Sequence, residues 1–259
     1  MNTKKERNIW LDVIRVISII MIMFYHFYDL HSILPTYNGM FSHGYLWVEM
    51  LFILSGFFIL DSLRNSDTFG VFVKKKLVRL TPALVICSLL TYLCLILFET
   101  SNPYGESHSF YDFIVSIFYV SPDLVNKVFG TKVKYINGGY WFLWVEILFY
   151  IFAAIVYYIN NEHFFRNFFI FSVLSFLIYY VVYRIAANCL TTNKLGLPFD
   201  SSVYKDVLSW CTIFHYFKFS VFFLIGILLR QLKSKKGKIS LRNVLLSLIV
   251  AVMLFASKW

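Results

Sequence analysis

The residues best suited to chemistry in this sequence are an arginine and a histidine set among apolar residues near the N-terminus. Arg15 and His26 are separated by ten residues, within an apolar stretch from Ile9 to Leu30. In a helix, the two side chains would differ by only about 20° around the axis and by about 16 Å along it. Asp12 falls within roughly 60° of the same line. One helix would therefore carry a polar stripe with a cation, a carboxylate and a titratable imidazole.

Such a stripe is expensive inside a bilayer, where an ionisable side chain marks a functional site by default. Two structural explanations stay open beside the functional one. Arg15 could form a buried ion pair with Asp12 at i, i+3. His26 could be an interfacial histidine, because it lies only about one turn from the end of the apolar stretch.

Further ionisable residues occur in later apolar stretches. Glu49 lies near the start of the second stretch, where it could be solvated, and Glu146 lies deeper in the fourth. A contact between His26 and Glu146 would fix the imidazole tautomer and stabilise its protonated form, as general-base catalysis requires. His215 and Lys218 occur at i, i+3 on one face of a late helix, although Lys218 could also snorkel to the membrane surface.

Three other motifs have both a structural and a functional explanation. The basic run that contains Lys74, Lys76 and Arg79 is explained by membrane topology, but it could also hold phosphate groups. Ser55 precedes a glycine, a pair of small residues typical of close helix packing. Trp141 and the aromatic residues around it could form an interfacial belt.

The elements that must position these residues are membrane helices. The chain has 259 residues, of which 59% are hydrophobic and only 15% charged, and its mean hydropathy is +0.68. The net charge of +10 comes from basic residues beside apolar stretches, which favours membrane topology over nucleic-acid binding. The four cysteines show no zinc-ligand spacing, so neither a metal nor a disulfide framework is expected.

The apolar stretches predict an all-α integral membrane protein, a polytopic helical bundle with about seven spanning helices. A shorter apolar segment, Phe110–Val120, cannot cross as a helix and is expected to be re-entrant or interfacial. The expected spans are Ile9–Leu30, Tyr45–Leu60, Pro82–Phe98, Tyr140–Ile159, Phe168–Ala187, Val207–Leu229 and Asn243–Trp259.

The distribution of positive charge predicts the orientation of this bundle. With the N-terminus in the cytoplasm, about two thirds of the Lys and Arg residues outside the spans fall on the cytoplasmic side. A full crossing by Phe110–Val120 would move the basic loop Arg230–Arg242 to the outside. The bias therefore favours seven crossings, with the N-terminus in the cytoplasm.

Taken in order, these segments resemble the acyltransferase-3 family of multi-spanning membrane acyltransferases. The pair Arg15 and His26 looks like the family's arginine-x10-histidine signature. Val48–Phe57 resembles its Val-Asp-x-Phe-Phe-x-x-Ser-Gly-Phe block, with Glu49 where aspartate is usual, and Lys76–Pro82 resembles its Arg-x-x-Arg-x-x-Pro element.

Two later blocks extend the resemblance to about Arg230. Phe222–Gly226 looks like a late Phe-Gly helix of the family. Family members usually have about ten spanning helices, so residues 1–259 are expected to form a single domain that lacks the last helices. The match to the Trp-x-Leu-x-x-Glu-x-x-Phe-Tyr block consists of Trp141, Leu143, Glu146, Phe149 and Tyr150.

The resemblance implies transfer of an acetyl group from cytoplasmic acetyl-coenzyme A to a hydroxyl of a surface carbohydrate, such as a capsule or exopolysaccharide, or of its lipid-linked precursor. His26 would deprotonate the acceptor hydroxyl, and Glu146 would orient the imidazole. The residues expected to hold the coenzyme's phosphates are Arg15, Lys74, Lys76 and Arg79. The residues expected to support substrate or structure are Asp12, Glu49, Ser55, Trp141, Tyr150, His215 and Lys218.

Two other functions remain open at this stage. A secondary transporter or flippase would also place polar residues inside a bundle. An inactive fragment that serves as a membrane partner is the third interpretation. The lipid bilayer is the expected surrounding in every case, with no nucleic acid, while the acceptor, the acyl group and any homo-oligomer stay undetermined.

Overall fold

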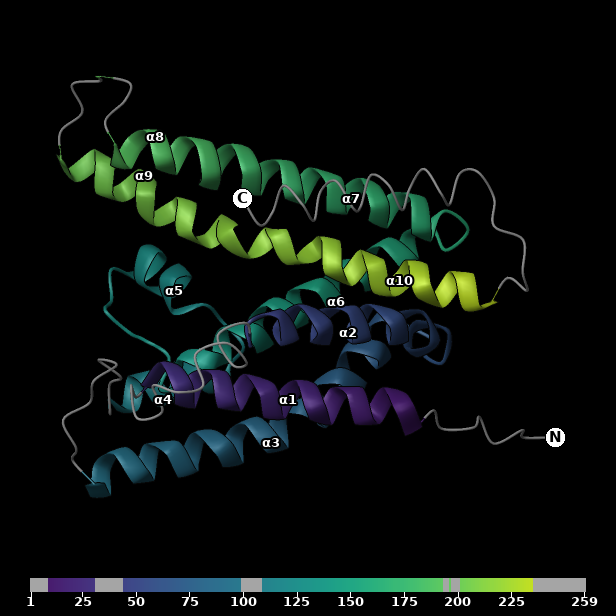
Figure 1. The fold of residues 1–259 in the computed structure, drawn as a ribbon, viewed down its shortest axis with the longest axis horizontal. Coiled ribbons are helices and arrows are strands. Elements are labelled where there is room, and N and C mark those ends of the chain that lie inside the picture. Colours follow the sequence, from purple (N-terminus) through teal and green to yellow (C-terminus); the bar gives the residue numbers. More distant parts are fainter. Residues whose placement is uncertain (1–8, 31–43, 99–108, 193–195, 197–200, 235–259) are drawn as a thin grey trace. The chain divides into compact units, whose positions relative to one another are not determined.

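The computed structural model describes residues 9–30, 44–98, 109–192, 196 and 201–234, and helices account for nearly all of them (Figure 1). No strand occurs in these ranges. Six helical stretches are long and apolar enough to cross a membrane, which confirms the all-α polytopic prediction. The seventh expected span, 243–259, lies outside the described residues. The six stretches are Ile9–His26, Leu46–Arg64, Phe69–Leu97, Gly138–Ile159, Phe164–Thr191 and Val207–Leu232.

The chain divides into two compact units. The first comprises residues 1–60 and 221–255, and the second comprises residues 61–220 and 256–259. In the first unit, the described helices are α1 (Ile9–Leu30), most of α2 (Leu46–Arg64) and most of α10 (Ser220–Ser234).

Two glycines bring the backbones of α2 and α10 into contact within the first unit. A Cβ atom on Gly56 would collide with the backbone carbonyl of Phe223, and one on Gly226 would collide with that of Ile53. Large side chains, among them Phe52 and Phe223, are fully buried around this contact. Small residues allow such close approach where helices pack in a membrane.

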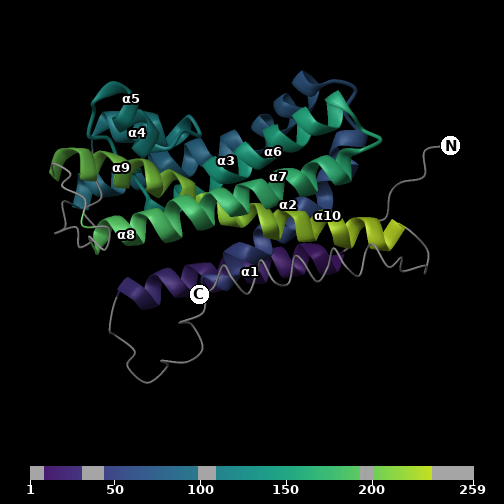
Figure 2. The same ribbon diagram turned by 90° about the horizontal axis from the view of Figure 1, so that it is seen from above.

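The second unit contains the remaining elements. Helix α3 packs against α4 and α6, α6 packs against α7, and the continuous path through α7, η3 and α8 runs beside α9 and η4 (Figure 2). The bounds of these elements are α3 (Phe69–Phe98), α4 (Phe110–Ile117), α5 (Pro122–Phe129), η2 (Gly138–Tyr140), α6 (Trp141–Ile159), α7 (Phe164–Ile178), η3 (Tyr179–Ala187), α8 (Asn188–Thr191), α9 (Ser201–Phe214) and η4 (His215–Phe219).

Helix α3 corrects one predicted boundary. It begins at Phe69 rather than at Pro82, so the proline lies inside a helix of 30 residues. A proline in a spanning helix is tolerated where the surroundings satisfy the carbonyl that it frees. The helix is about 45 Å long, which exceeds a hydrocarbon thickness of about 30 Å, so its basic first turns can extend beyond the apolar layer.

The short apolar segment after residue 109 forms the eight-residue helix α4, too short to cross a membrane, as expected. Its buried polar side chains hold the loop that precedes η2. The Asp112 carboxylate accepts the backbone N–H of Lys134 at 2.8 Å, and the Ser116 hydroxyl oxygen accepts that of Ile136 at 2.9 Å. The loop is therefore fixed at two points, one on each side of Tyr135.

The glycine contact predicts a large effect from one added methyl group. Gly226→Ala should lower the free energy of unfolding by about 1–3 kcal/mol, because the methyl group forces α10 away from α2. The thermal midpoint of the purified protein in detergent measures this loss. Gly70→Ala is the matched control, since no atom lies within 4 Å of its added Cβ. Equal midpoints for the two variants would show that the close approach does not constrain the fold.

Candidate active site

Helix α1 carries the polar stripe predicted from the sequence. The helix is unbroken from Ile9 to Leu30, which keeps Arg15 and His26 on one face. The Arg15 guanidinium lies 3.8 Å from the Asp12 carboxylate and 5.5 Å from the centre of the Phe58 ring. Both charged side chains are about one-third exposed, at 34% and 32%. The ion pair considered from the sequence is thus present, but it is partly exposed rather than buried, and it leaves Arg15 accessible to an anionic ligand.

His26 lies towards the other end of this stripe, and its side chain is exposed. Its ring meets the edge of Tyr25, with the ring centres 5.6 Å apart. Tyr25 also contacts Tyr45 at 6.3 Å and leaves no room for a Cβ on Gly44. The residues at the start of α2 therefore pack against the turn that carries His26, while the imidazole stays open to a substrate.

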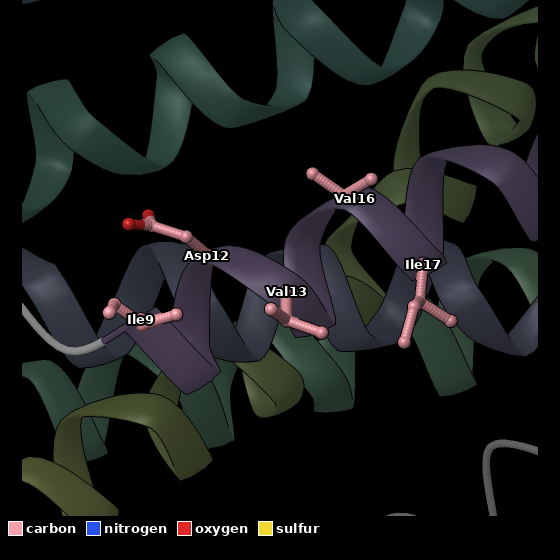
Figure 3. Close-up of a pocket in the computed structure, with 5 residues that line it drawn as sticks. All are labelled: Ile9, Asp12, Val13, Val16 and Ile17. Atoms are coloured by element: carbon pink, nitrogen blue, oxygen red, sulfur yellow. The ribbon is translucent and has the colours of Figure 1, made fainter.

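An apolar hollow of about 580 Å³ borders the stripe (Figure 3). Among the described residues, its lining comes from one face of α1, and Asp12 is the polar one of them. Aliphatic side chains suit an uncharged chain better than a phosphate group. The lining residues are Ile9, Asp12, Val13, Val16 and Ile17.

A second polar cluster lies in the second unit, between α3 and α6. Glu146 is buried, and its carboxylate accepts a hydrogen bond of 2.7 Å from the Tyr150 hydroxyl one turn along α6. The Lys76 ammonium lies 4.2 Å from the centre of the Tyr150 ring and 5.3 Å from that of Phe72. One tyrosine thus connects a buried carboxylate, through its hydroxyl, with a buried cation, through its ring.

Tyr119 belongs near this cluster, although the sequence did not single it out. Its φ of 54° is the one left-handed value at a non-glycine residue in the described ranges, a conformation that costs about 1–3 kcal/mol. Its hydroxyl lies 3.3 Å from that of Thr81 in α3. Burial raises the pKa of Tyr119, the Thr81 hydrogen bond opposes this, and the negative charge of Glu146 adds to the rise. Tyr119 is therefore a neutral hydrogen-bonding group near Glu146.

The three basic residues of α3 that are expected to hold phosphates differ in their surroundings. Lys74 and Arg79 are exposed on α3, whereas Lys76 is only 7% exposed. Their places on the helix explain this difference, because Lys76 faces α6 and the aromatic rings described above. Lys74 and Arg79 are the two that an approaching anion can reach directly.

The structure gives the other predicted residues distinct settings. Glu49 is half-buried in the first turn of α2, and Ser55 is buried beside the glycine contact. Trp141 stacks on Tyr216, with ring centres 5.1 Å apart, near the segment η4 that contains His215 and Lys218. The contact between His26 and Glu146 stays a prediction, since these residues belong to different units.

These observations define a polytopic, all-helical membrane protein with an arginine and a histidine on one helix face and a buried carboxylate on another helix. The chain belongs to the acyltransferase-3 family, whose sequence profile, described as an acyltransferase domain, matches residues 8–258. This finding confirms the family indicated by the sequence motifs.

One curated relative is an O-acetyl transferase of Shigella phage Sf6. The two chains are 32% identical over 151 residues, which cover 56% of this chain and 44% of the phage protein. The chain thus matches less than half the length of that relative. No solved structure matches this protein.

The hydrogen bond in the second cluster can be tested by removing one oxygen. Tyr150→Phe should destabilise the protein by about 1–3 kcal/mol, because the buried Glu146 carboxylate loses a donor. Thermal unfolding in detergent measures the change. Tyr111→Phe, at a 73% exposed tyrosine, is the matched control and should leave the midpoint unchanged. If the thermal midpoint of Tyr150→Phe equals that of the control, the hydrogen bond does not stabilise the fold.

Proposed function

We propose that this protein is a membrane O-acyltransferase that moves an acetyl group from acetyl-coenzyme A to a hydroxyl of a surface carbohydrate or its lipid-linked precursor. The polar face of α1 carries this proposal. It combines an accessible cation with an exposed imidazole about 16 Å further along the helix. The family and the name of the phage relative support the same class of reaction.

The cations on α1 and α3 are the side chains proposed to bind the coenzyme. Arg15, Lys74 and Arg79 are accessible side chains suited to the phosphates of the coenzyme. The apolar hollow that Asp12 borders would accommodate the less polar pantetheine arm, which carries the thioester. The buried Lys76 instead provides positive charge next to Tyr150 and, through its hydroxyl, Glu146.

His26 is the side chain proposed to carry out the chemical step. The imidazole accepts the proton of the acceptor hydroxyl while the hydroxyl oxygen attacks the thioester carbonyl carbon. The C–S bond then breaks, the acyl group stays on the acceptor oxygen, and the thiolate of coenzyme A leaves and takes up the proton. We assign Glu146 to electrostatic support of this step, as the family motif implies.

We also propose the orientation and the membrane. The excess of Lys and Arg on one side of the predicted spans favours a cytoplasmic N-terminus. The resemblance to the acyltransferase-3 family implies that the membrane is a bacterial cell membrane. In that orientation, the Arg15 end of α1 faces the compartment that contains acetyl-coenzyme A. His26 then lies further towards the outer surface, where a surface glycan or its precursor would be acylated.

His26→Ala should lower acetyl transfer by about 10²–10⁴-fold, the usual contribution of a general base. The measurement is the O-acetyl content of surface glycans by mass spectrometry, in cells with matched amounts of membrane-inserted protein. His163→Ala is the control, because His163 is also exposed but lies at the start of α7. Full acetylation in cells that carry His26→Ala would exclude His26 as the base.

Arg15→Ala should raise the KM for acetyl-coenzyme A by roughly tenfold or more, because a charge-assisted hydrogen bond to phosphate is lost. Release of the coenzyme thiol by purified protein measures this constant, and Arg166→Ala, at an exposed arginine of α7, serves as the control. Asp12→Ala is the structural comparison, because it breaks the ion pair and leaves the Arg15 cation in place. Equal effects of Arg15→Ala and Asp12→Ala would mean that Arg15 acts only within that pair.

The same assay discriminates the transporter alternative. An acyltransferase releases thiol from acetyl-coenzyme A when an acceptor is present, whereas a transporter moves solute without this release. Solute uptake by reconstituted protein that never consumes the thioester would overturn the proposed function.

A further inference from the structure

Two helix irregularities meet in the second unit. Residues Tyr179–Ala187 form a π-helix within the path from α7 to α8, and His215–Phe219 form a 3₁₀-helix between α9 and α10. These segments contact one another. The His215 ring lies 4.7 Å from that of Tyr183 and 6.1 Å from that of Tyr179. Such departures from the α-helix are frequent at functional sites.

Three buried polar atoms, on α6, on η4 and in the loop before η2, lack a hydrogen-bond partner. They are the hydroxyl oxygen of Tyr135, the indole nitrogen of Trp144 and the Nδ1 atom of His215. The fourth such atom in the described residues is the Ser88 hydroxyl oxygen on α3. A buried polar group without a partner is costly and calls for an explanation. A polar ligand that accepts and donates hydrogen bonds would satisfy all three.

Tyr135 reaches its place because the chain on both sides of it is anchored. The residue before it donates its backbone N–H to Asp112 in α4, and the residue after it donates to Ser116. Burial, reinforced by Tyr216 and by the charge of Asp123, raises the pKa of Tyr135 well above its usual range. The phenol therefore remains a neutral donor at every physiological pH.

An aromatic platform lies beside these polar atoms. The Trp141 ring stacks on Tyr216 at 5.1 Å with an angle of 25° between the ring planes, and it contacts Phe219 at 5.2 Å. Trp144 follows one turn along α6. A pyranose ring combines an apolar face of C–H groups with hydroxyls around its edge. It matches a flat aromatic surface that is bordered by isolated hydrogen-bonding atoms.

The charge around the platform is mainly positive. Arg184 and Lys218 are both electrostatic neighbours of His215, and the Lys218 ammonium lies 5.1 Å from the centre of the Phe219 ring. Asp123 is the acidic neighbour of Tyr216. A sugar that carries a phosphate or another anionic group fits this balance better than a neutral sugar.

We infer that this sugar platform, formed by Tyr135, Trp141, Trp144, His215 and Tyr216, binds the carbohydrate ring of the acceptor. The inference rests on the proposed function and adds the residues that hold the acceptor. The sugar's apolar face lies on the aromatic surface, its hydroxyls satisfy the three partnerless atoms, and its anionic group lies towards Arg184 and Lys218.

The test uses glucose 1-phosphate as the probe, with glucose and inorganic phosphate as separate arms. Saturation-transfer NMR on the full chain in detergent, without acyl-coenzyme A, should show transfer to the ring protons of both sugars and tighter binding of the phosphorylated one. Trp141→Leu should weaken binding by roughly tenfold, whereas Trp141→Tyr retains a flat ring and should stay within a few-fold of wild type. Trp10→Leu, at a 76% exposed tryptophan of α1, is the matched control and should change nothing.

Tyr135→Phe separates a binding role from a structural one. Removal of a partnerless hydroxyl should leave the thermal midpoint unchanged or raise it, yet weaken sugar binding several-fold. A lower midpoint with unchanged binding would overturn the inference. It would also be overturned if Trp141→Leu bound the probe as well as Trp10→Leu does, or if inorganic phosphate displaced the probe without any saturation of sugar protons.

The binding assay and the transfer assay can fail separately. Acetyl transfer with an unchanged KM for the acceptor in Trp141→Leu would refute the sugar platform and leave the enzyme intact. Sugar binding by a protein that never consumes acetyl-coenzyme A would refute the proposed function and leave the binding site.

Discussion

The hydrogen bond from Tyr150 to Glu146 shows the constraint on which this structure depends, because a polar group in a membrane helix must find its partner inside the protein. Several hydroxyls in the spans meet this demand within their own helix. Ser18 and Thr91 each donate to the carbonyl oxygen four residues earlier, at 2.8 and 2.9 Å. Ser172 in α7 instead donates across to the carbonyl of Ser220 at 3.4 Å. The buried polar atoms of Tyr135, Trp144 and His215, which have no hydrogen-bond partner, are exceptions to this pattern.

The apolar stretches of the sequence predict most of the fold, since a spanning helix must be long and continuously apolar. Ile9–Leu30 is predicted to the residue, and the segment after residue 109 is a short helix as expected. The predicted start of α3 at Pro82 was wrong. A proline usually marks the end of a helix pattern in a sequence, but Pro82 lies within this helix. The irregular segments η3 and η4 could not be predicted either, since their residues continue an ordinary apolar pattern.

The sequence predicts those parts of the candidate site that lie on a single helix. Helical periodicity places Arg15 and His26 on one face, because only one backbone is involved. Contacts between elements are different. The burial of Lys76 beside exposed Lys74 depends on the position of α6, and the role of Tyr119 depends on a turn with an unusual φ. A local sequence pattern predicts neither the burial of Lys76 nor the role of Tyr119.

The glycine contact between α2 and α10 has a consequence for how the catalytic cycle can work. With backbone against backbone at Gly56 and Gly226, a piston-like slide of one helix would drive a bulky side chain into the space that only hydrogen can occupy. Helices α2 and α10 must therefore move together as one rigid unit. Under the proposed function, α2 and α10 would stay fixed relative to one another, and the flexible arm of the donor would carry the acyl group along α1.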